Sequence, residues 1–202
     1  MHSKKSEEVE RELSRAQLKK LVALAQRTIW KKLSGEPIPS VSEIKAQVGT
    51  SDFIRLCVPQ GAFVTLTIGR ELRGCIGSIM PEGPLWESVR ANALNAAFHD
   101  PRFEPLSKEE FAKTEIEVSA LSPLYELKYS GADDLISKLE PRVHGVLLRF
   151  KDGSGATFLP QVWDDLPTAD EFLSHLCMKA GKPAGAWKNE KPAVFTYTVQ
   201  HI

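Results

Sequence analysis

The stretch FIRLCVPQGAFVTLTIGRELRGCIGS, residues 53–78, decides the fold class of this 202-residue chain. Residues 53–58 and 62–68 are short runs rich in Val, Ile, Thr and Phe, which is typical of strands, and the segment PQG at 59–61 predicts a hairpin turn between them. A third strand is predicted from Glu71 to Ile76. Because the connections are too short for parallel crossovers, these runs indicate an antiparallel meander.

A helix is predicted before this meander, from Ser14 to Leu33, because apolar residues recur there at a spacing of three and four. Ser14 is a suitable N-cap, and Gly35 provides a left-handed stop. Residues 1–13 are predicted to be a frayed N-terminal segment.

Helices and strands are mixed in the rest of the chain. Helices are predicted over 84–98, after the capping pair Ser107 and Glu110, over 130–139, and from Thr168 to about Ala180; strands are predicted over 115–121, 143–150, 156–159 and 193–199. This mixture indicates an α+β fold, with a mainly antiparallel sheet built from hairpins and flanking helices. No linker-like stretch divides residues 14–202, so they are predicted to form a single domain.

Composition and charge narrow the classes of function. The 26 Lys and Arg residues balance 26 Asp and Glu residues, so no excess positive charge favours nucleic acid or an anionic membrane. No run approaches the roughly 18 apolar residues of a membrane span. The three cysteines are odd in number and widely spaced, which favours a reducing cytoplasm.

Several familiar cofactor sites are excluded by their missing motifs. The sequence contains no Cys-x-x-Cys pair, no His-Glu-x-x-His, no Walker loop and no Cys-x-x-x-Cys-x-x-Cys run. We therefore predict no metal ligands, and the sequence indicates no particular cofactor.

The most informative motif is LRGCIGS at 72–78. Alternation along a strand would place Leu72 and Ile76 on one face and Arg73 and Cys75 together on the other. A nearby guanidinium stabilises a thiolate, which makes Cys75 a candidate nucleophile. The glycines at 74 and 77 add backbone freedom, so that N–H groups near Ser78 can bind an anionic group. The alternative is a buried core cysteine in a strand whose glycines allow close packing.

His144 is the second candidate site residue. In a strand over 143–150 it shares a face with Val146 and Leu148 and is followed by Gly145, which suits a general acid or base in a half-closed pocket. The alternative is a histidine that is hydrogen-bonded inside the core.

Two further segments offer polar groups. Asp100 and Arg102 follow the predicted helix and can form a charged pair near a possible cleft. The alternative is a turn with a surface ion pair. Gln161 follows a predicted strand and would bind substrate or cap the turn.

The segments LRGCIG at 72–77, DPRF at 100–103, VHG at 143–145 and FLPQV at 158–162 together resemble the AmmeMemoRadiSam system protein A family, also called the AMMECR domain family. They occur in the family's order, and the resemblance covers roughly residues 15–200. It implies an α+β fold with a larger and a smaller lobe. The family name records association with a Memo-type protein and a radical SAM protein. The resemblance implies a site that consists of Arg73, Gly74, Cys75, Gly77 and His144.

These observations leave three hypotheses. The first is a cytosolic transferase or hydrolase of a modification pathway, in which Cys75 is nucleophile or acyl carrier, Arg73 favours the thiolate or binds an anion, and His144 is acid or base; Gly74, Gly77, Ser78 and Gln161 would bind the ligand. The second is a non-catalytic ligand-binding or adaptor subunit that works with Memo-type and radical SAM partners. The third, RNA modification or binding, is disfavoured by the neutral charge.

Overall fold

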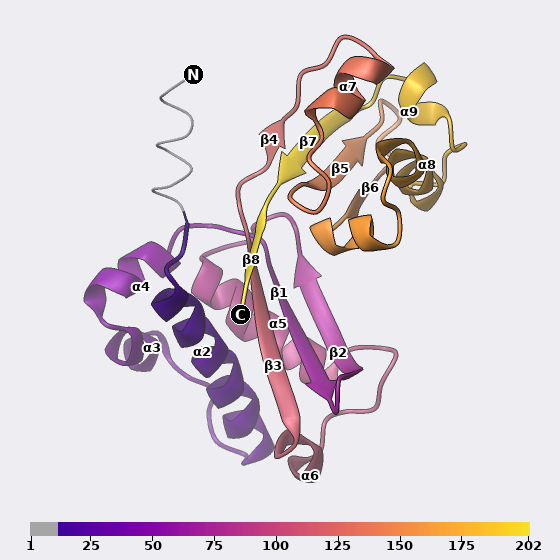
Figure 1. Ribbon diagram of the computed structural model, residues 1–202. Coiled ribbons are helices and arrows are strands. Elements are labelled where there is room, and N and C mark those ends of the chain that lie inside the picture. The colour runs from indigo at the N-terminus through magenta and orange to yellow at the C-terminus, as the bar shows by residue number, and fades with distance from the viewer. Residues whose placement is uncertain (1–11) are drawn as a thin grey trace. The chain divides into compact units, whose positions relative to one another are not determined.

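The computed structural model describes residues 12–202, which divide into two compact units (Figure 1). Unit 1 contains the described residues up to Ser122 together with Gln200–Ile202, and unit 2 contains Pro123–Val199. Each unit has a four-stranded sheet and its own helices, so the predicted α+β class is confirmed. The frayed segment predicted at 1–13 lies, except for its last two residues, outside the described residues. A single domain over 14–202 stays a prediction.

Unit 1 begins with the predicted helix, α2 (Arg15–Leu33). The side chains of Ser14 and Gln17 form a reciprocal capping box at its start, and Gly35 follows its end with a left-handed backbone (φ 73°). Leu21 and Ile29 of its apolar stripe are fully buried. Local sequence chemistry therefore accounts for both ends of this helix.

The sheet of unit 1 has the strand order β2-β1-β3-β8. Its strands are β1 (Ala62–Ile68), β2 (Glu71–Ser78), β3 (Thr114–Leu121) and β8 (Val199–His201), and two further helices of the unit are α5 (Leu85–Phe98) and α6 (Lys108–Phe111). Helix α5 lies behind the sheet in Figure 1, and Val64, Val89 and Val118 are buried between them. We call the opposite face, which carries Phe63 and Thr65, the open face.

Residues 53–58 are not a strand, and that prediction is wrong. Two helices precede β1: α3 (Val41–Val48), which was not predicted, and α4 (Thr50–Leu56). In α4, Leu56 is buried and Phe53 packs on the core, whereas Ile54 is 67% exposed. The two core-facing residues are three positions apart, as expected for one face of a helix. Tertiary burial outweighs the β-propensity of Phe, Ile and Val here. Residues 59–61 consequently link a helix to β1 and are not a hairpin turn.

Unit 2 has a sheet in the order β4-β7-β5-β6. Its elements are β4 (Tyr125–Glu126), α7 (Ala132–Lys138), β5 (Gly145–Arg149), β6 (Gly155–Phe158), the 3₁₀ helix η1 (Pro160–Asp164), α8 (Ala169–Lys179), α9 (Ala186–Asn189) and β7 (Ala193–Tyr197). The predicted hairpin between β5 and β6 is confirmed. The core of this unit centres on Trp163, which stacks on Phe172 with ring centroids 3.9 Å apart.

Two strand boundaries differ from the prediction in ways that affect the site. The single strand predicted at 193–199 is two strands, β7 in the sheet of unit 2 and β8 in the sheet of unit 1. The strand predicted from Val143 begins only at Gly145, so His144 lies in the preceding turn rather than on a strand face.

Candidate functional site

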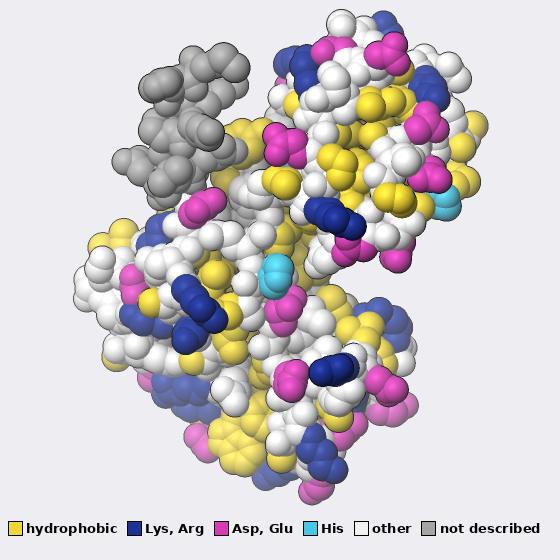
Figure 2. Space-filling view, viewed as in Figure 1, with side chains coloured by type: hydrophobic (Ala, Val, Ile, Leu, Met, Phe, Trp, Pro, Cys, Tyr) yellow, Lys and Arg dark blue, Asp and Glu magenta, His cyan; other side chains and the backbone are white. Residues whose placement is uncertain are grey.

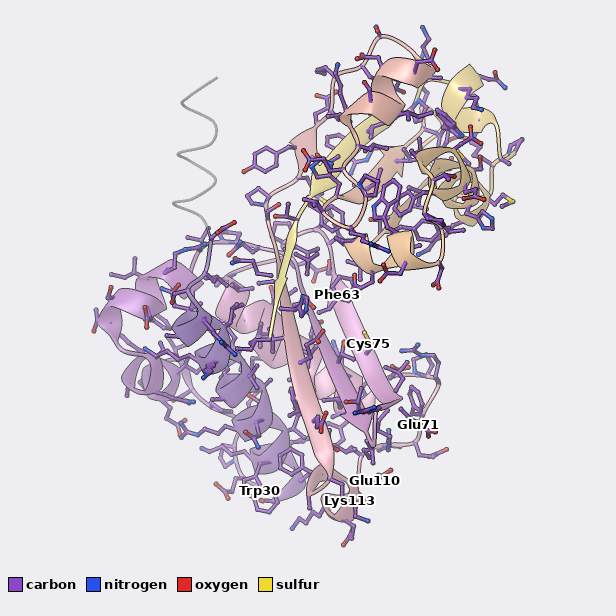
Figure 3. The ribbon with its side chains drawn as sticks, viewed as in Figure 1. Trp30, Phe63, Glu71, Cys75, Glu110 and Lys113 are labelled. Carbon is purple, nitrogen blue, oxygen red and sulfur yellow. The ribbon has the colours of Figure 1, made fainter. Side chains whose placement is uncertain are left out.

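Cys75 lies midway along β2, at the edge of the sheet of unit 1, and faces the open side (Figure 3). Its neighbour Gly74 faces the other way, since a Cβ there would come within 2.2 Å of the Ala96 carbonyl oxygen of α5. On the open face, a Cβ on Gly77 would collide with the ring of Phe63. Neither glycine has a positive φ. Close packing, rather than the backbone freedom predicted from sequence, therefore explains both glycines.

A β-bulge changes the predicted arrangement of β2. Thr67 pairs with Leu72, and the next residue of β1, Leu66, pairs with Gly74, so Arg73 is the extra residue. Leu72 therefore shares the open face with Thr67, whereas Ile76 packs on the core. The prediction that Leu72 and Ile76 share one face is wrong because simple alternation does not continue through a bulge.

The guanidinium of Arg73 is bound to α6. Nε and Nη2 donate to the two carboxylate oxygens of Glu110 (2.9 and 3.1 Å), and Nη2 also donates to the Glu104 carbonyl (2.8 Å). Figure 3 shows Glu110 at one end of the strands, away from Cys75. Arg73 holds the pKa of Glu110 at about 2, mainly through these hydrogen bonds. The positive charge of Arg73 is thus compensated by a carboxylate, and its effect on the Cys75 thiol stays a prediction.

Asp100 and Arg102 hold the backbone of Cys75 at the free edge of β2. The Asp100 carboxylate accepts the N–H of Cys75 (2.9 Å), and Nη2 of Arg102 donates to the Cys75 carbonyl (3.2 Å). The two side chains are also bound to each other, with 2.7 Å between Arg102 Nη2 and Asp100 Oδ2. The hydrogen bond from Arg102 lowers the pKa of Asp100, whose side chain is only 1% exposed. This clamp replaces a neighbouring strand and fixes the position of Cys75.

Thr65 is the direct partner of the thiol. It lies opposite Cys75 in the β1–β2 register, and its Oγ1 donates to the sulfur at 3.3 Å. The thiol of Cys75 thus has a hydrogen-bond partner and remains partly exposed. The position of Cys75 is therefore fixed through both its backbone and its sulfur.

Polar side chains continue across the open face beyond Thr65. Glu117 pairs with Thr65, and Ser119 pairs with Phe63. Val118 and Ile202 exchange reciprocal backbone hydrogen bonds, which places His201 of β8 opposite Ser119. Figure 2 shows a histidine beside an acidic side chain over this part of the sheet. Strands lie about 5 Å apart, so Glu117 is about 10 Å from Cys75 and does not contact the thiol directly.

Sequence analysis did not select Thr65, Glu117, Ser119 or His201 as site residues. The polar side of β3 is visible as Glu115, Glu117 and Ser119 alternating with apolar residues. That β1 lies between β2 and β3 could not be read from the sequence.

Ser78, the last residue of β2, lines a pocket of about 250 Å³. The pocket lies between the end of β2 and α5, and its polar lining includes Glu82, Glu87 and Asn95. The Ser78 hydroxyl itself donates to the Met80 carbonyl (2.8 Å). This is the part of the predicted ligand-binding segment that borders a cavity.

His144 and Gln161 belong to unit 2, whereas Cys75 belongs to unit 1. Nδ1 of His144 accepts the backbone N–H of Glu140 (3.1 Å), so the neutral ring carries its proton on Nε2. In that form Nε2–H is a hydrogen-bond donor, and Nδ1 is occupied by the N–H of Glu140. Gln161 is exposed in η1. The catalytic role predicted for His144 and the ligand-binding role predicted for Gln161 stay predictions.

Within residues 12–202, no group of three or more His, Cys, Asp or Glu side chains could hold a metal ion. The same residues include no helix that is long and apolar enough to cross a membrane.

The fold and the site define a class: an α+β protein that presents a clamped, partly exposed cysteine on the open face of an antiparallel sheet. The AMMECR1 family pattern matches residues 22–202, and the chain belongs to this family. A protein of Nanoarchaeum equitans is 36% identical over 186 residues, which cover 89% of this chain and 96% of that protein. An Aquifex aeolicus protein is 34% identical, with 90% and 89% covered. The crystal structure of an uncharacterized protein from Pyrococcus horikoshii has a TM-score of 0.74, at 29% identity and with 90% and 88% of the two chains covered.

Proposed function

We propose that this AMMECR1-family protein is a cysteine-dependent transferase or hydrolase of a modification pathway, with Cys75 as its nucleophile. One observation carries the proposal: the partly exposed thiol accepts a hydrogen bond from Thr65 while Asp100 and Arg102 fix its backbone. Fixed geometry favours attack on a bound substrate, because less entropy is lost in reaching the transition state.

In the proposed reaction, the Cys75 thiolate attacks an acyl carbon. A carbon–sulfur bond forms, and the bond to the leaving group breaks; that group takes the electron pair and accepts a proton. Water or an acceptor nucleophile then attacks the thioester and releases the thiolate. The leaving group takes its proton from water, and the acid or base role of His144 stays a prediction.

The substrate and the setting are part of the proposal. The pocket beside Ser78, with the carboxylates of Glu82 and Glu87, suits a polar or cationic part of the substrate. The three cysteines are unpaired, which supports a cytoplasmic location. Memo-type and radical SAM proteins are proposed partners by family resemblance, and the balanced charge disfavours nucleic acid.

The test uses p-nitrophenyl acetate as an acyl donor, with mass spectrometry to locate the acetyl group. We expect Cys75 to be acylated at least about tenfold faster than Cys57, which also is partly exposed, and to turn over repeatedly. Cys75→Ser should abolish turnover, whereas Cys57→Ser should retain it.

Equal acylation of Cys75 and Cys57, or turnover that survives in Cys75→Ser, would overturn the proposal and favour the non-catalytic adaptor. If Cys75→Ser instead abolishes turnover, untargeted metabolite profiling of cells that carry wild type or Cys75→Ser identifies the natural substrate, as a compound that accumulates only in the variant.

A further inference from the structure

Unit 2 contains a second pocket, which the proposed function does not use. It has a volume of about 440 Å³, within the range of small-molecule sites. It lies where β4 and β5 end and β7 begins, so three neighbouring strands of one sheet build it (Figure 1). The backbone hydrogen bond from Leu127 to Val194 joins two of its walls (2.8 Å).

The charged side chains around this pocket are mostly positive. Lys128, Arg149, Lys151 and Lys191 line it, with Glu126 as the one carboxylate in its lining. Glu126 is paired with Lys128. Arg149, Lys151 and Lys191 have no carboxylate partner among residues 12–202.

Most other cations of the same unit are paired with carboxylates. Lys182 contacts both Asp152 (2.7 Å) and Glu190 (3.0 Å), and Lys188 is paired with Asp170. Of the cations of unit 2 without a carboxylate partner among the described residues, Arg149, Lys151 and Lys191 line this pocket and Lys179 does not, in a chain whose formal net charge is zero. Such a local excess attracts an anion.

The pocket also has an apolar lining, which includes the half-buried residues Leu127, Tyr129 and Ala193. The guanidinium of Arg149 lies 5.5 Å from the ring centre of Phe195. The Tyr129 hydroxyl donates to the Pro192 carbonyl (2.7 Å) and so ties the segment after β4 to the segment before β7. A ligand that fits has an apolar body as well as a charge.

We propose that this pocket binds a small organic anion, a carboxylate or phosphate monoester whose apolar body contacts Leu127, Tyr129 and Ala193 and whose charged group meets Arg149, Lys151 and Lys191. Guanidinium and ammonium groups recognise both kinds of anion, and Arg149 can bind either with two parallel hydrogen bonds.

The test measures binding of phenyl phosphate, benzoate, inorganic phosphate and benzyl alcohol to the full chain by calorimetry, at low and at physiological salt. The first two share the ring and differ in the anion, so their comparison identifies the headgroup. We expect phenyl phosphate or benzoate to bind about tenfold more tightly than inorganic phosphate, because the ring leaves water, and benzyl alcohol to bind weakest.

Two variants with equal charge changes locate the site. Arg149→Gln with Lys151→Gln should weaken binding at least about tenfold, whereas Lys179→Gln with Lys188→Gln, on helices outside the pocket, should leave it unchanged. Lys191 has a left-handed backbone (φ 46°), so Lys191→Asn removes its charge with a residue that tolerates this conformation.

Equal loss in both double variants would overturn the proposal, because binding would then depend on diffuse charge. It would also be overturned by tight binding of a single-stranded RNA without measurable binding of either aromatic anion. Cys75→Ser should bind these anions as wild type does, so the result is independent of the acyl-transfer test.

Discussion

The cations around Cys75 are paired with carboxylates, whereas most of those around the pocket of unit 2 are not. Beside Cys75, Arg73 is bound to Glu110, and Arg102 is bound to a buried Asp100. At the pocket of unit 2, Arg149, Lys151 and Lys191 have no carboxylate among the described residues. Paired charges fix atoms in place, which a nucleophile needs, whereas uncompensated charges attract a ligand that supplies the missing anion.

The largest effect is expected when the buried charge beside Cys75 is removed. Asp100→Asn keeps the size of the side chain but leaves Arg102 without its carboxylate. We expect a loss of about 3 kcal/mol in the free energy of unfolding, reduced from a fully buried pair because the Arg102 side chain is 52% exposed. Urea denaturation measures it.

Asp164→Asn is the matched control, since Asp164 pairs with Arg142 on the surface of unit 2. It should cost less than about 0.5 kcal/mol. Similar losses in the two variants would show that the clamp at Cys75 is no more important than a surface ion pair.

The two ion pairs near Cys75, Asp100–Arg102 and Glu110–Arg73, should make the stability of the protein sensitive to acid. Asp100 and Glu110 have lowered pKa values in the folded protein, mainly because Arg102 and Arg73 donate hydrogen bonds to them. Their contribution is therefore complete above the ordinary carboxyl range near pH 4 and is lost as the pH falls below it. The difference in unfolding free energy between wild type and Asp100→Asn should shrink on going from neutral pH to pH values below about 3. A difference that stays constant over that range would contradict the assignment.

A smaller effect is expected at Arg73, where geometry matters more than charge. Arg73→Lys keeps the charge but loses the two-point contact with Glu110 and the bond to the Glu104 carbonyl. We expect a loss of about 1 kcal/mol, because the Glu110 side chain is 39% exposed. Arg142→Lys, at an exposed residue whose Nε donates to Asp164, should be neutral in the same denaturation experiment. If Arg73→Lys were also neutral, the bidentate contact would contribute nothing to stability.

Helix ends could be predicted from local sequence, whereas features that depend on tertiary packing could not. The capping residues Ser14, Ser107 and Thr168 correctly located three helices. The same pattern, Ser40 followed by Glu43, begins the helix α3 that was not predicted, so that helix was detectable. Nothing local distinguishes the helix at Thr50–Leu56 from a strand, since its residues favour both.

At the candidate site, the residues could be selected from the sequence, but the contacts between them could not be predicted. Cys75 was selected from a motif, and Asp100 with Arg102 from their position after a helix. That these two side chains bind the backbone of Cys75 depends on α5 lying against β2, a contact between residues 25 apart in sequence. The bulge at Arg73, which redirects this side chain to Glu110, likewise has no recognisable pattern in the sequence.

The smallest and most specific effect is expected at Thr65, the direct partner of the thiol. Thr65→Val has nearly the same shape but cannot donate to the sulfur. The thiolate is the species that reacts with iodoacetamide, so alkylation of Cys75 in the folded protein should slow by about threefold, the loss of one modest hydrogen bond. Thr67→Val is the control, because Thr67 lies on the same strand and face but pairs with Leu72. Cys177 is buried, and burial raises the pKa of its thiol, so it should react slowest in every variant. A rate for Cys75 that is unchanged in Thr65→Val, or that falls equally in Thr67→Val, would show that the hydroxyl of Thr65 does not support the thiolate.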